Sequence, residues 1–528
     1  MSSSFLLALL SLLLCRCDFA SSQSVDSLGS SGGTGPTGGI GDLNNPVKHP
    51  QAFVTDARIS HIPNSTRQLA VGPAPRLLDD RGAKHSGCAE RRDLLIDSTA
   101  NGAKQHMVGF GHSWTGSTVS VFNNLDNDTF DQMMQELFGQ DGNNMGFMRH
   151  TIGSSDLDGD QYSYDDNGPS FNEGEPDNEL ASFTIGPHGR DMLDMISRMG
   201  IYKSDVFLFG SPWSYPAWAK HNNLFIAPWK NEGSYSNIMN NSFNTRYIPQ
   251  MTDYFTKYID TYKAKGVTVN GITLMNEPLN SQGGYPCMYL DAVDQAALIA
   301  GGVGQAMRAR GVKIMAYDHN TDQPMYPMRV MQGAPGLVDA AAWHCYQSPA
   351  ANYTVLEDWH QAYPDTAQFM TECSNYQPKV GAYNWKVAQN FLSPVKYGAS
   401  GASMWVMATD PNYGPHSIYG GCDGCSGSII VNSSTVYTKT NDYYMVGHFS
   451  RFIRRGAVHH RILSGLFGTS MDHNQFDAIA IQNPDQSWAV IFMNNAGSDQ
   501  DVVVSFKDNH AKWQGTIPNG TVTSWVLP

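Results

Sequence analysis

Two glutamates stand at the ends of strongly apolar stretches, and their spacing could bring both carboxylates to one place. Glu277 follows the run 272–276 and Glu372 follows the run 369–371. The separation of 95 positions between 277 and 372 is about 32 for each of three β-α units. This is close to the roughly 31 residues of one unit when a barrel of about 250 residues contains eight. Paired carboxylates are the groups that cleavage of a glycosidic bond requires. One protonates the leaving oxygen, and the other attacks the anomeric carbon or activates water.

A single glutamate at the end of a strand more often belongs to a structural ion pair, and Asn276-Glu-Pro278 can recur by chance. The pair is more informative, because both acids stand in register among aromatic residues. The carboxyl groups would lie about 5–5.5 Å apart in a retaining enzyme and about 6.5–9.5 Å apart in an inverting one, and the sequence leaves this gap open. A catalytically silent glycan-binding protein on the same fold is a competing interpretation, and the presence of both carboxylates argues against it.

Other polar and aromatic residues end neighbouring apolar runs. The residues at these positions are Trp114, Arg149, Asp156, Trp213, Asn276, Asp318, His344, Tyr346 and Trp405. In such a pair one carboxylate must stay ionised, and a positive or hydrogen-bonding neighbour could hold it so. Its charge would raise the pKa of the other carboxyl, which would start as the proton donor and act as base once the first is esterified. Tryptophan rings offer flat apolar faces to the C–H side of a sugar.

The elements that would carry these residues repeat one theme: an apolar run of strand length, a polar loop and a helix. The eight runs are 107–111, 146–151, 205–211, 271–276, 313–318, 340–346, 367–372 and 402–408. Continuous apolar runs are typical of parallel strands buried on both faces. They predict an α/β fold with a (β/α)8 TIM barrel, in which catalytic residues project from the carboxyl ends of the strands.

The segments between the runs contain helix signals. Residues 129–132 match a capping box, and Gly139 is a stop signal. Apolar residues line one helical face in 192–199, before Gly200, and in 251–262, before Gly266. These stripes indicate helices that pack on a core.

The chain ends predict a second domain. After about residue 456, short alternating strands at 478–482, 487–493, 502–506 and 521–527 indicate an antiparallel β-sandwich. We expect strands in 64–100 to complete it. Residues 1–20 would be a signal peptide and 21–63 a flexible Ser/Gly-rich tether, which leaves 101–455 to the barrel and 456–528 to the sandwich.

The amino terminus indicates export. The apolar run 5–14 is followed by small residues at 20–22, as in a secretory signal, and it is too short to cross about 30 Å of hydrocarbon. Sites of the form Asn-x-Ser/Thr begin at Asn64, Asn127, Asn240, Asn352, Asn432 and Asn519. We therefore expect a secreted protein that acts outside the cell or in a cell wall.

An oxidising compartment would permit disulfides among the six cysteines after the signal, for which 15 full pairings exist. They are Cys88, Cys287, Cys345, Cys373, Cys422 and Cys425. Cys422-Asp-Gly-Cys425 favours a small disulfide loop. Cys345 and Cys373 would lie on neighbouring strands and point away from the barrel mouth, either bridged or as two buried thiols.

Composition excludes several classes of function. Lys and Arg number 34 against 48 acids, for a net charge of −14, so a basic nucleic-acid-binding face is not expected. Few charged residues (16 %) and many aromatic ones (11 %) suit a neutral polar ligand. We found neither a phosphate-binding Gly-rich loop nor a metal-ligand trio around His344, and therefore expect no cofactor and no metal. We found no basic amphipathic helix, expect no stable membrane insertion, and infer no oligomeric state.

Several motifs, in order, resemble those of glycoside hydrolase family 30, which belongs to a clan of retaining (β/α)8 glycosidases. The matching segments are 109–115, 149–156, 211–218, 276–278, 343–346, 371–372 and Trp405, within a resemblance that runs from about residue 100 to the carboxyl terminus. The resemblance implies that Glu277 is the general acid/base, that Glu372 is the nucleophile and that Asn276 binds the sugar 2-hydroxyl. It also implies that the −1 subsite is shaped by Arg149, Asp156, Trp213, His344, Tyr346 and Trp405.

Two loops, 276–288 and 420–425, look most like the endo-β-1,6-glucanase branch of this family. The resemblance therefore implies a β-glucan substrate, with glucosylceramidase or another exo-β-glycosidase as the alternative. One segment departs from the family. Many relatives have small residues and then Thr-Asp after the first strand, whereas this chain has His112-Ser-Trp114-Thr-Gly116 without the Asp. Family roles for that loop do not carry over.

Overall fold

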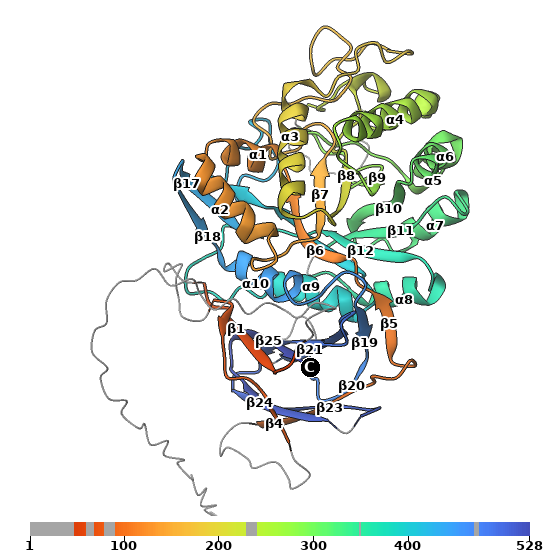
Figure 1. Cartoon of the computed structure of the whole chain (residues 1–528). Coiled ribbons are helices and arrows are strands. Elements are labelled where there is room, and N and C mark those ends of the chain that lie inside the picture. The colour runs from red at the N-terminus through yellow and green to blue at the C-terminus, as the bar shows by residue number, and fades with distance from the viewer. Residues whose placement is uncertain are drawn as a thin grey trace, which may run out of the picture. The chain divides into compact units, whose positions relative to one another are not determined.

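Parallel strands close into an eight-stranded barrel in the computed structural model, which describes residues 47–59, 68–78, 90–228, 240–347, 350–468, 475–509 and 511–528 (Figure 1). In chain order the barrel strands are β6 (Gly109–Trp114), β7 (Phe147–Thr151), β8 (Phe207–Ser211), β9 (Gly271–Thr273), β10 (Lys313–Asn320), β11 (Ala340–His344), β12 (Ala367–Glu372) and β14 (Gly401–Val406). Strands that follow one another in this series are neighbours, and the last strand, β14, pairs with the first, β6, to close the barrel. Each predicted run is confirmed as one of these strands, with ends shifted by a few residues.

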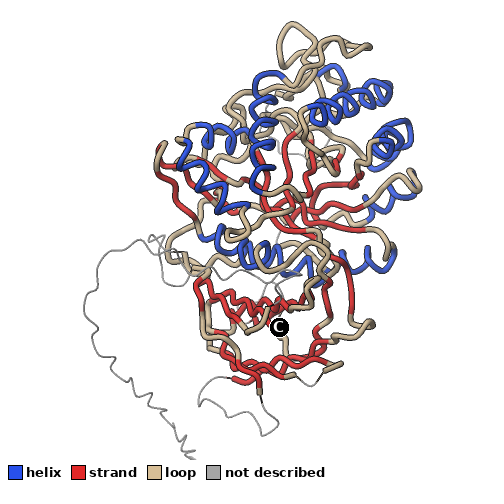
Figure 2. The backbone as a smooth tube through the Cα atoms, viewed as in Figure 1, coloured by secondary structure: helices blue, strands red, loops and turns tan. Residues whose placement is uncertain are grey.

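Helices surround the barrel strands (Figure 2). They are α1 (Gly116–Asn123), α2 (Asn127–Phe138), α3 (Gly186–Tyr202), α4 (Ile248–Ala264), α5 (Ala292–Leu298), α6 (Gly304–Ala309), α7 (Met325–Gly333), α8 (Thr354–Ala362), α9 (Lys386–Lys396) and α10 (Asn441–Ser450). A π-helical turn, η4 (Ile299–Val303), joins α5 to α6, and 3-10 turns form at η1 (Ala217–Ala219) and η3 (Thr245–Tyr247). Both apolar stripes predicted for α3 and α4 are buried. Among the described residues, no helix combines the length and apolarity needed to cross a bilayer.

Two helix ends differ from prediction. The amino-terminal cap of α2 is Asp126, whose carboxylate accepts a hydrogen bond from the Thr129 backbone amide at 2.8 Å, so the box predicted at 129–132 is wrong. Asp126 competes successfully because its short side chain reaches that unpaired amide. The stop at Gly139 is confirmed, whereas α3 continues past Gly200 to Tyr202.

Strand alternation builds the barrel interior in layers. Phe147, Phe209 and Phe369 belong to an apolar plug, with ring centroids 4.9 Å from Phe147 to each of the other two. Residues two positions further along each strand lie on the same face, because successive side chains point to opposite faces of a sheet. Arg149, Ser211 and Thr371 therefore form a polar layer directly above the plug.

Two sheets, one antiparallel and one mixed, form the second domain. The seven-stranded sheet contains, in order, β2 (Ala70–Val71), β1 (Gln51–Asp56), β25 (Thr521–Leu527), β22 (Trp488–Asn495), β21 (Gln475–Gln482), β19 (Val458–His460) and β5 (Ala103–His106). The five-stranded sheet contains β20 (Ile462–Ser464), β4 (Glu90–Ile96), β23 (Gln500–Phe506), β24 (Lys512–Ile517) and β3 (Arg76–Leu77), with β4 and β23 parallel. Strands from both chain ends thus build one sandwich, as predicted.

Two predicted boundaries differ from the structure. Residues 51–56, assigned to the tether, instead form β1, which pairs with β25 along its whole length. Residues 103–106, assigned to the barrel, form β5 in the sandwich sheet. In both places a short strand gains its stability from a distant partner, which local composition does not reveal. The predicted signal peptide and residues 21–46 of the tether lie outside the described residues.

Barrel and sandwich meet through α10. His448 in this helix makes hydrogen bonds of 2.7 Å to the Ser524 hydroxyl in β25 and to the Thr55 hydroxyl in β1. Asp442, the second residue of α10, accepts hydrogen bonds from the amides of Asn375 and Asn384, in the loop after β12. The helix therefore ties the sandwich to a loop at the barrel mouth.

Short strands and two disulfides shape the loops at that mouth. β13 (Asn375–Tyr376) pairs with β16 (Cys425–Ser426), and β15 (Ala408–Thr409), β17 (Ile429–Ser433) and β18 (Val436–Lys439) form a further small sheet. Cys422 bonds to Cys425, as favoured, and Cys345 bonds to Cys373, one of the two states left open. Cys287 is free and buried, and Cys88 lies outside the described residues.

Candidate active site

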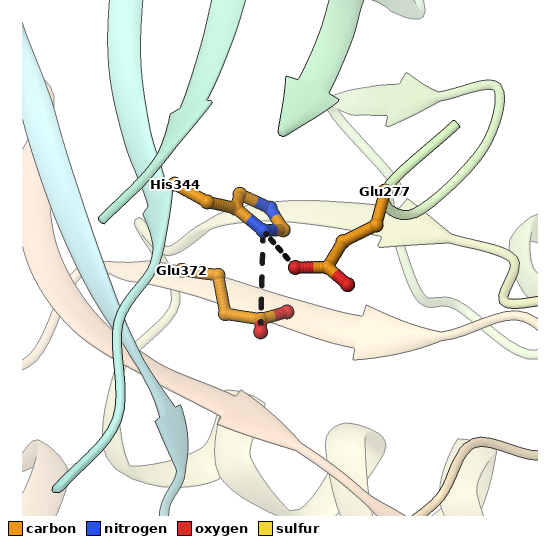
Figure 3. Close-up of side chains that lie close together, drawn as sticks. All are labelled: Glu277, His344 and Glu372. Carbon is orange, nitrogen blue, oxygen red and sulfur yellow. Dashed lines mark hydrogen bonds and ion pairs between the residues drawn. The ribbon is translucent and has the colours of Figure 1, made fainter. Parts of the chain in front are cut away.

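Glu277, His344 and Glu372 meet at the carboxyl end of the barrel (Figure 3). One oxygen of each carboxylate and one imidazole nitrogen all lie within 4.8 Å of one another. His344 Nδ1 is 3.4 Å from Glu277 Oε1 and 4.0 Å from Glu372 Oε1. The imidazole is fully buried, while 16 % of the Glu277 side chain and 7 % of the Glu372 side chain are exposed. The two predicted carboxylates therefore lie close together, and Glu277 is the more exposed of the two.

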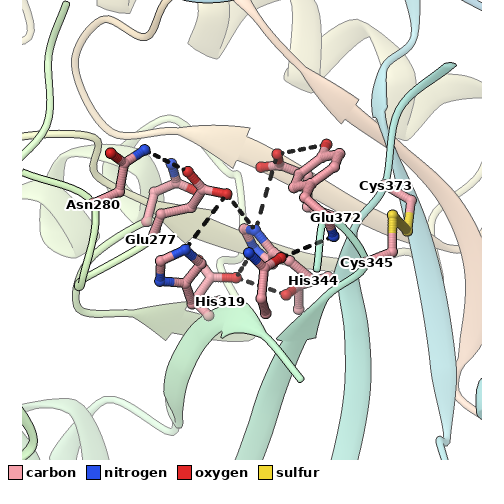
Figure 4. Close-up of polar contacts among 12 residues, drawn as sticks. Glu277, Asn280, His319, His344, Cys345, Glu372 and Cys373 are labelled. Carbon is pink, nitrogen blue, oxygen red and sulfur yellow. Dashed lines mark hydrogen bonds and ion pairs between the residues drawn. A yellow bond between two sulfur atoms is a disulfide. The ribbon is translucent and has the colours of Figure 1, made fainter. Parts of the chain in front are cut away.

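Glu277 is held by a tight turn after β9. Its φ is +45°, a conformation that costs a residue with a side chain roughly 1–2 kcal/mol. Its backbone amide donates to the Asp318 carbonyl at 2.9 Å, and its carbonyl accepts from the Asn280 amide at 2.7 Å. The Asn280 side chain also donates to Glu277 Oε2 at 2.9 Å (Figure 4). These bonds fix the carboxylate against the barrel mouth.

Glu372 ends β12 beside a register shift. The pairing of β11 with β12 slips between Trp343 and His344, and this irregularity turns Glu372 toward the mouth although Thr371 already points inward. The Tyr346 hydroxyl donates to Glu372 Oε1 at 2.9 Å, and the Arg149 guanidinium donates to Oε2. Hydrogen bonds and positive charge from these two neighbours favour the ionised carboxylate.

Arg149 and Asp318 form the buried centre of the site, and both are fully enclosed. The guanidinium donates to Asp318 Oδ2 at 2.8 Å, to Asn276 Oδ1 at 2.7 Å and to the Ser211 hydroxyl at 3.2 Å. A buried ion pair keeps its charges only when further hydrogen bonds satisfy them. Asp318 receives those bonds from hydroxyls at 2.7 Å (Ser211, Thr273) and 2.6 Å (Thr371), and from His344 Nε2 at 2.9 Å.

The four ionisable groups shift one another's pKa values. Burial lowers the pKa of His344, but the charges of Glu372 and Asp318 raise it by more, so that the pKa is about 9. Burial raises the pKa of Asp318, and the charges of Arg149 and His344 overcome this and hold it well below the usual range. His344 is therefore an imidazolium at neutral pH, flanked by carboxylates.

The two glutamates shift in opposite directions. Burial raises the pKa of Glu277, but His319 and His344 oppose it and bring it to about 2. Burial raises the pKa of Glu372 above its ordinary value, despite the opposing charges of His344 and Arg149. The expectation that Glu277 has the raised pKa is therefore wrong for this geometry, because the two imidazoles beside Glu277 lower its pKa.

Trp213 and Trp405 stack on each other at the mouth, with ring centroids 4.7 Å apart and planes 27° apart. The Arg149 guanidinium lies 4.7 Å from the Trp213 ring and 5.7 Å from the Trp405 ring, within reach of cation–π attraction. Both tryptophans are at most 3 % exposed. Their contact with a sugar stays a prediction, and their observed contacts are with each other and with Arg149.

Asp156 is near the pair but bonds elsewhere. Its carboxylate accepts from the backbone amide of Cys422, in the disulfide loop, at 2.9 Å. Burial, opposed by this bond and assisted by the charges of Glu372 and Glu277, raises its pKa to about 7. Asp156 thus links the loop 422–425 to the site through charge rather than through a direct hydrogen bond to either glutamate.

The structure brings together every predicted site residue and adds others. Asp318 ended a predicted strand but was left out of the site, and its chain position was the available signal. His319, whose Nε2 lies 3.9 Å from Glu277 Oε1, and Asn280 had no such signal. Trp114 is not at the site, because its fully buried ring packs on Phe122 and Phe138 under α1 and α2.

In the part of the chain that the structure describes, Glu277, His344 and Glu372 are also a group whose ligand atoms lie close enough together to hold a metal ion. An imidazole ligates a metal through an unprotonated nitrogen. His344 Nε2 donates to Asp318, and the raised pKa of the ring keeps the proton on Nδ1. Its charge state therefore suits proton transfer better than metal binding.

Two domain families account for most of the chain. The glycosyl hydrolase family 30 TIM-barrel domain matches residues 107–453, and the β-sandwich domain of the same family matches residues 464–525. The chain belongs to glycosyl hydrolase family 30. It is therefore a glycoside hydrolase by family, with the barrel and sandwich that the sequence predicted.

Individual relatives differ in how similar they are. An endo-1,6-β-D-glucanase of Trichoderma harzianum is 40 % identical over 440 residues, which cover 83 % of this chain and 87 % of that protein. The lysosomal acid glucosylceramidase of Mus musculus is 23 % identical over 439 residues, covering 79 % and 80 %. Among solved structures, an endo-β-1,6-glucanase has a TM-score of 0.73 at 23 % identity, covering 91 % of this chain and 99 % of that one, and shares the fold.

Proposed function

We propose that the protein is a secreted, retaining endo-β-1,6-glucanase that cleaves cell-wall β-1,6-glucan by double displacement. One observation carries the retaining assignment: an oxygen of Glu277 lies within 4.8 Å of an oxygen of Glu372. Retaining pairs are about 5–5.5 Å apart, whereas inverting pairs leave about 6.5–9.5 Å for a water molecule. The short gap supports direct attack by one carboxylate.

Glu372 is the proposed nucleophile. Arg149 and Tyr346 donate hydrogen bonds to its two oxygens. These bonds favour the ionised carboxylate and orient it toward the barrel mouth. Attack on the anomeric carbon forms a glycosyl ester and breaks the bond to the leaving oxygen. Arg149 also orders Asn276, the residue proposed to bind the sugar 2-hydroxyl.

Glu277 is the proposed acid and base, and His344 holds the proton that it needs. His344 Nδ1 lies 3.4 Å from Glu277 Oε1. A sugar that fills the mouth excludes water and so removes the solvation of separated charges. Proton transfer from the imidazolium to the carboxylate then gives a neutral pair and arms Glu277 as the acid. Once Glu372 is esterified, Glu277 removes a proton from the attacking water.

The substrate assignment rests on relatives. The fungal endo-1,6-β-D-glucanase is 40 % identical to this chain over the 440 aligned residues, whereas the mouse glucosylceramidase is 23 % identical over 439. The low charge content fits a neutral polysaccharide. Four of the five described glycosylation motifs have an exposed asparagine (Asn127, Asn240, Asn352 and Asn432), which supports passage through the secretory route.

A product profile tests this assignment. Purified protein is incubated with β-1,6-, β-1,3- and β-1,4-glucans and with glucosylceramide, and products are separated by chain length. We expect a ladder of β-1,6-linked oligosaccharides and at most trace cleavage elsewhere. Release of glucose alone, or cleavage of glucosylceramide without cleavage of β-1,6-glucan, would favour the exo-acting alternative.

A further inference from the structure

A groove of about 740 Å³ adjoins the proposed catalytic pair. It is formed by residues that follow β11, residues 375–390 after β12, and Ile59 and Asn495 from the sandwich side. Tyr346 lines this groove and also donates its hydroxyl to Glu372. The groove is therefore continuous with the catalytic site and shares one of its side chains.

The lining has the chemistry of a carbohydrate site. Its polar residues are mainly amides and its aromatic residues are Tyr346, Tyr353, Tyr376, Tyr383 and Trp385. Among the described lining residues, only Lys379 and Lys386 carry charge, and there is no acid. Amides exchange hydrogen bonds with neutral hydroxyl groups in both directions, and the absence of acids among these residues gives a cationic polymer no partner.

Two exposed tyrosine rings, Tyr376 and Tyr383, line the groove. The Tyr383 and Trp385 rings are parallel within 5°, with centroids 5.8 Å apart, and Tyr383 is 51 % exposed. Tyr376 is 58 % exposed, and its hydroxyl donates to Asp423 at 2.7 Å. Apolar surface that several exposed rings share in one groove is typical of a binding site. Their flat faces suit the C–H side of a pyranose ring.

The groove is built before any ligand arrives. Residues 57–59 pair with 381–384 through backbone bonds, from Ile59 to Ala382 and from Gly381 to Ile59 at 2.9 Å each. On the other side, Asn375 and Asn384 both donate to the buried carboxylate of Asp442. A preorganised loop loses little conformational freedom on binding, which favours affinity.

We propose that this groove binds a second stretch of the same neutral β-glucan chain whose cleaved bond lies at Glu277 and Glu372. The inference rests on the proposed function and extends it, because it places the chain along Tyr346, Tyr376 and Tyr383. The groove lets the enzyme hold a polymer at several glucosyl units, which an endo-acting enzyme needs and a single pocket at Glu372 does not supply.

Chain-length dependence of the kinetics tests the groove. The variants are Tyr383→Ala, Tyr376→Ala and the matched ring-preserving Tyr383→Phe, with Ile201→Ala as an exposed apolar control at the carboxyl end of α3. Each is assayed on β-1,6-linked oligosaccharides of increasing length and on the polymer. We expect Tyr383→Ala to raise KM for the polymer about three- to tenfold, with an effect that grows with chain length. Ile201→Ala should follow the wild-type profile, and Tyr383→Phe, which keeps the ring, should raise KM less than Tyr383→Ala.

A second measurement separates binding from turnover. Glu372→Gln, alone and combined with Tyr383→Ala, is run in affinity gels that contain the polymer. A weaker retardation of the double variant supports the groove, and melting temperatures check that each variant is folded.

The proposal for the groove and the proposed function can be refuted independently of each other. If wild type cleaves β-1,6-glucan but both alanine variants keep the wild-type chain-length profile and gel retardation, the groove is refuted and the function stands. If wild type cleaves another β-glucan instead, the function is refuted, and the same variants decide the groove on that polymer. Cleavage of no β-glucan would overturn both.

Discussion

Each glutamate of the pair has a different set of neighbours, and those neighbours assign the roles. Glu372 faces Arg149 and Tyr346, which donate to a carboxylate, whereas Glu277 faces the protonated His344. At the scale of the residue, the site therefore contains one fixed anion and one carboxylate beside a mobile proton. This asymmetry can be tested by removing each carboxylate in turn.

Alanine at each glutamate should produce distinct losses. Glu372→Ala should abolish turnover of both glucan and a dinitrophenyl β-glucoside, because no ester can form. Glu277→Ala should lose glucan turnover by about 10²–10⁴-fold but keep much more activity on the dinitrophenyl substrate, whose leaving group needs no proton. Added azide should give an α-glucosyl azide with the first variant and a β-glucosyl azide with the second. The reverse pattern would exchange the two roles.

Asp318→Asn tests a positioning residue. Asp318 bonds both Arg149 and His344, so loss of its charge should lower the pKa of His344 from about 9 and release the guanidinium. We expect kcat to fall about 10²–10³-fold with a smaller change in KM. NMR titration of the His344 ring checks the cause. The exposed Asp322→Asn, four positions along, is the control. An unchanged His344 titration would contradict the proposal that Asp318 raises the pKa of His344.

At the scale of the element, the Cys345–Cys373 bridge joins the ends of β11 and β12, which carry His344 and Glu372. Its partners are 28 positions apart, and a loop of that length restricts the unfolded chain by roughly 3 kcal/mol. Cys345→Ser with Cys373→Ser should therefore lower the melting temperature clearly. Serines at Cys422 and Cys425, only 3 positions apart, should lower it less. Equal effects would mean that loop closure does not set the stabilisation.

The eight barrel strands could be predicted because each is a continuous apolar run, and β9 and β12 end in the two acids. The sequence could not show that β1 and β5 belong to the sandwich, because their partners β25 and β19 lie hundreds of residues away. Register shifts at Tyr317–His319 and beside His344 also escaped prediction, and they turn Asp318 and Glu372 into the site. The pKa order depends on this three-dimensional arrangement and so was misjudged.

At the scale of the whole molecule, His448 couples the two domains and should make their stability depend on pH. Burial lowers its pKa to about 3, against about 6.5 in an unfolded chain. The neutral ring is the folded form, so its contribution to the free energy of unfolding is complete above pH 6.5 and is lost as pH falls toward 3.

His448→Gln should therefore destabilise the protein at pH 7 and should do so by about 2 kcal/mol less at pH 5, because the variant lacks the buried group that resists protonation. Urea unfolding at both pH values measures the two differences. The exposed His106→Gln is the control. A destabilisation by His448→Gln that is larger at pH 5 than at pH 7 would contradict the assigned neutral state.

The stereochemistry of the first product tests the central claim most directly. If Glu372 attacks the anomeric carbon and Glu277 then activates water, configuration is inverted twice and the product emerges with its original configuration. Time-resolved proton NMR of β-1,6-glucan digestion should show the β-anomer first, with the α-anomer appearing only as mutarotation proceeds. An α-anomer formed first would mean a single displacement by water, and it would refute the double-displacement roles assigned to Glu277 and Glu372.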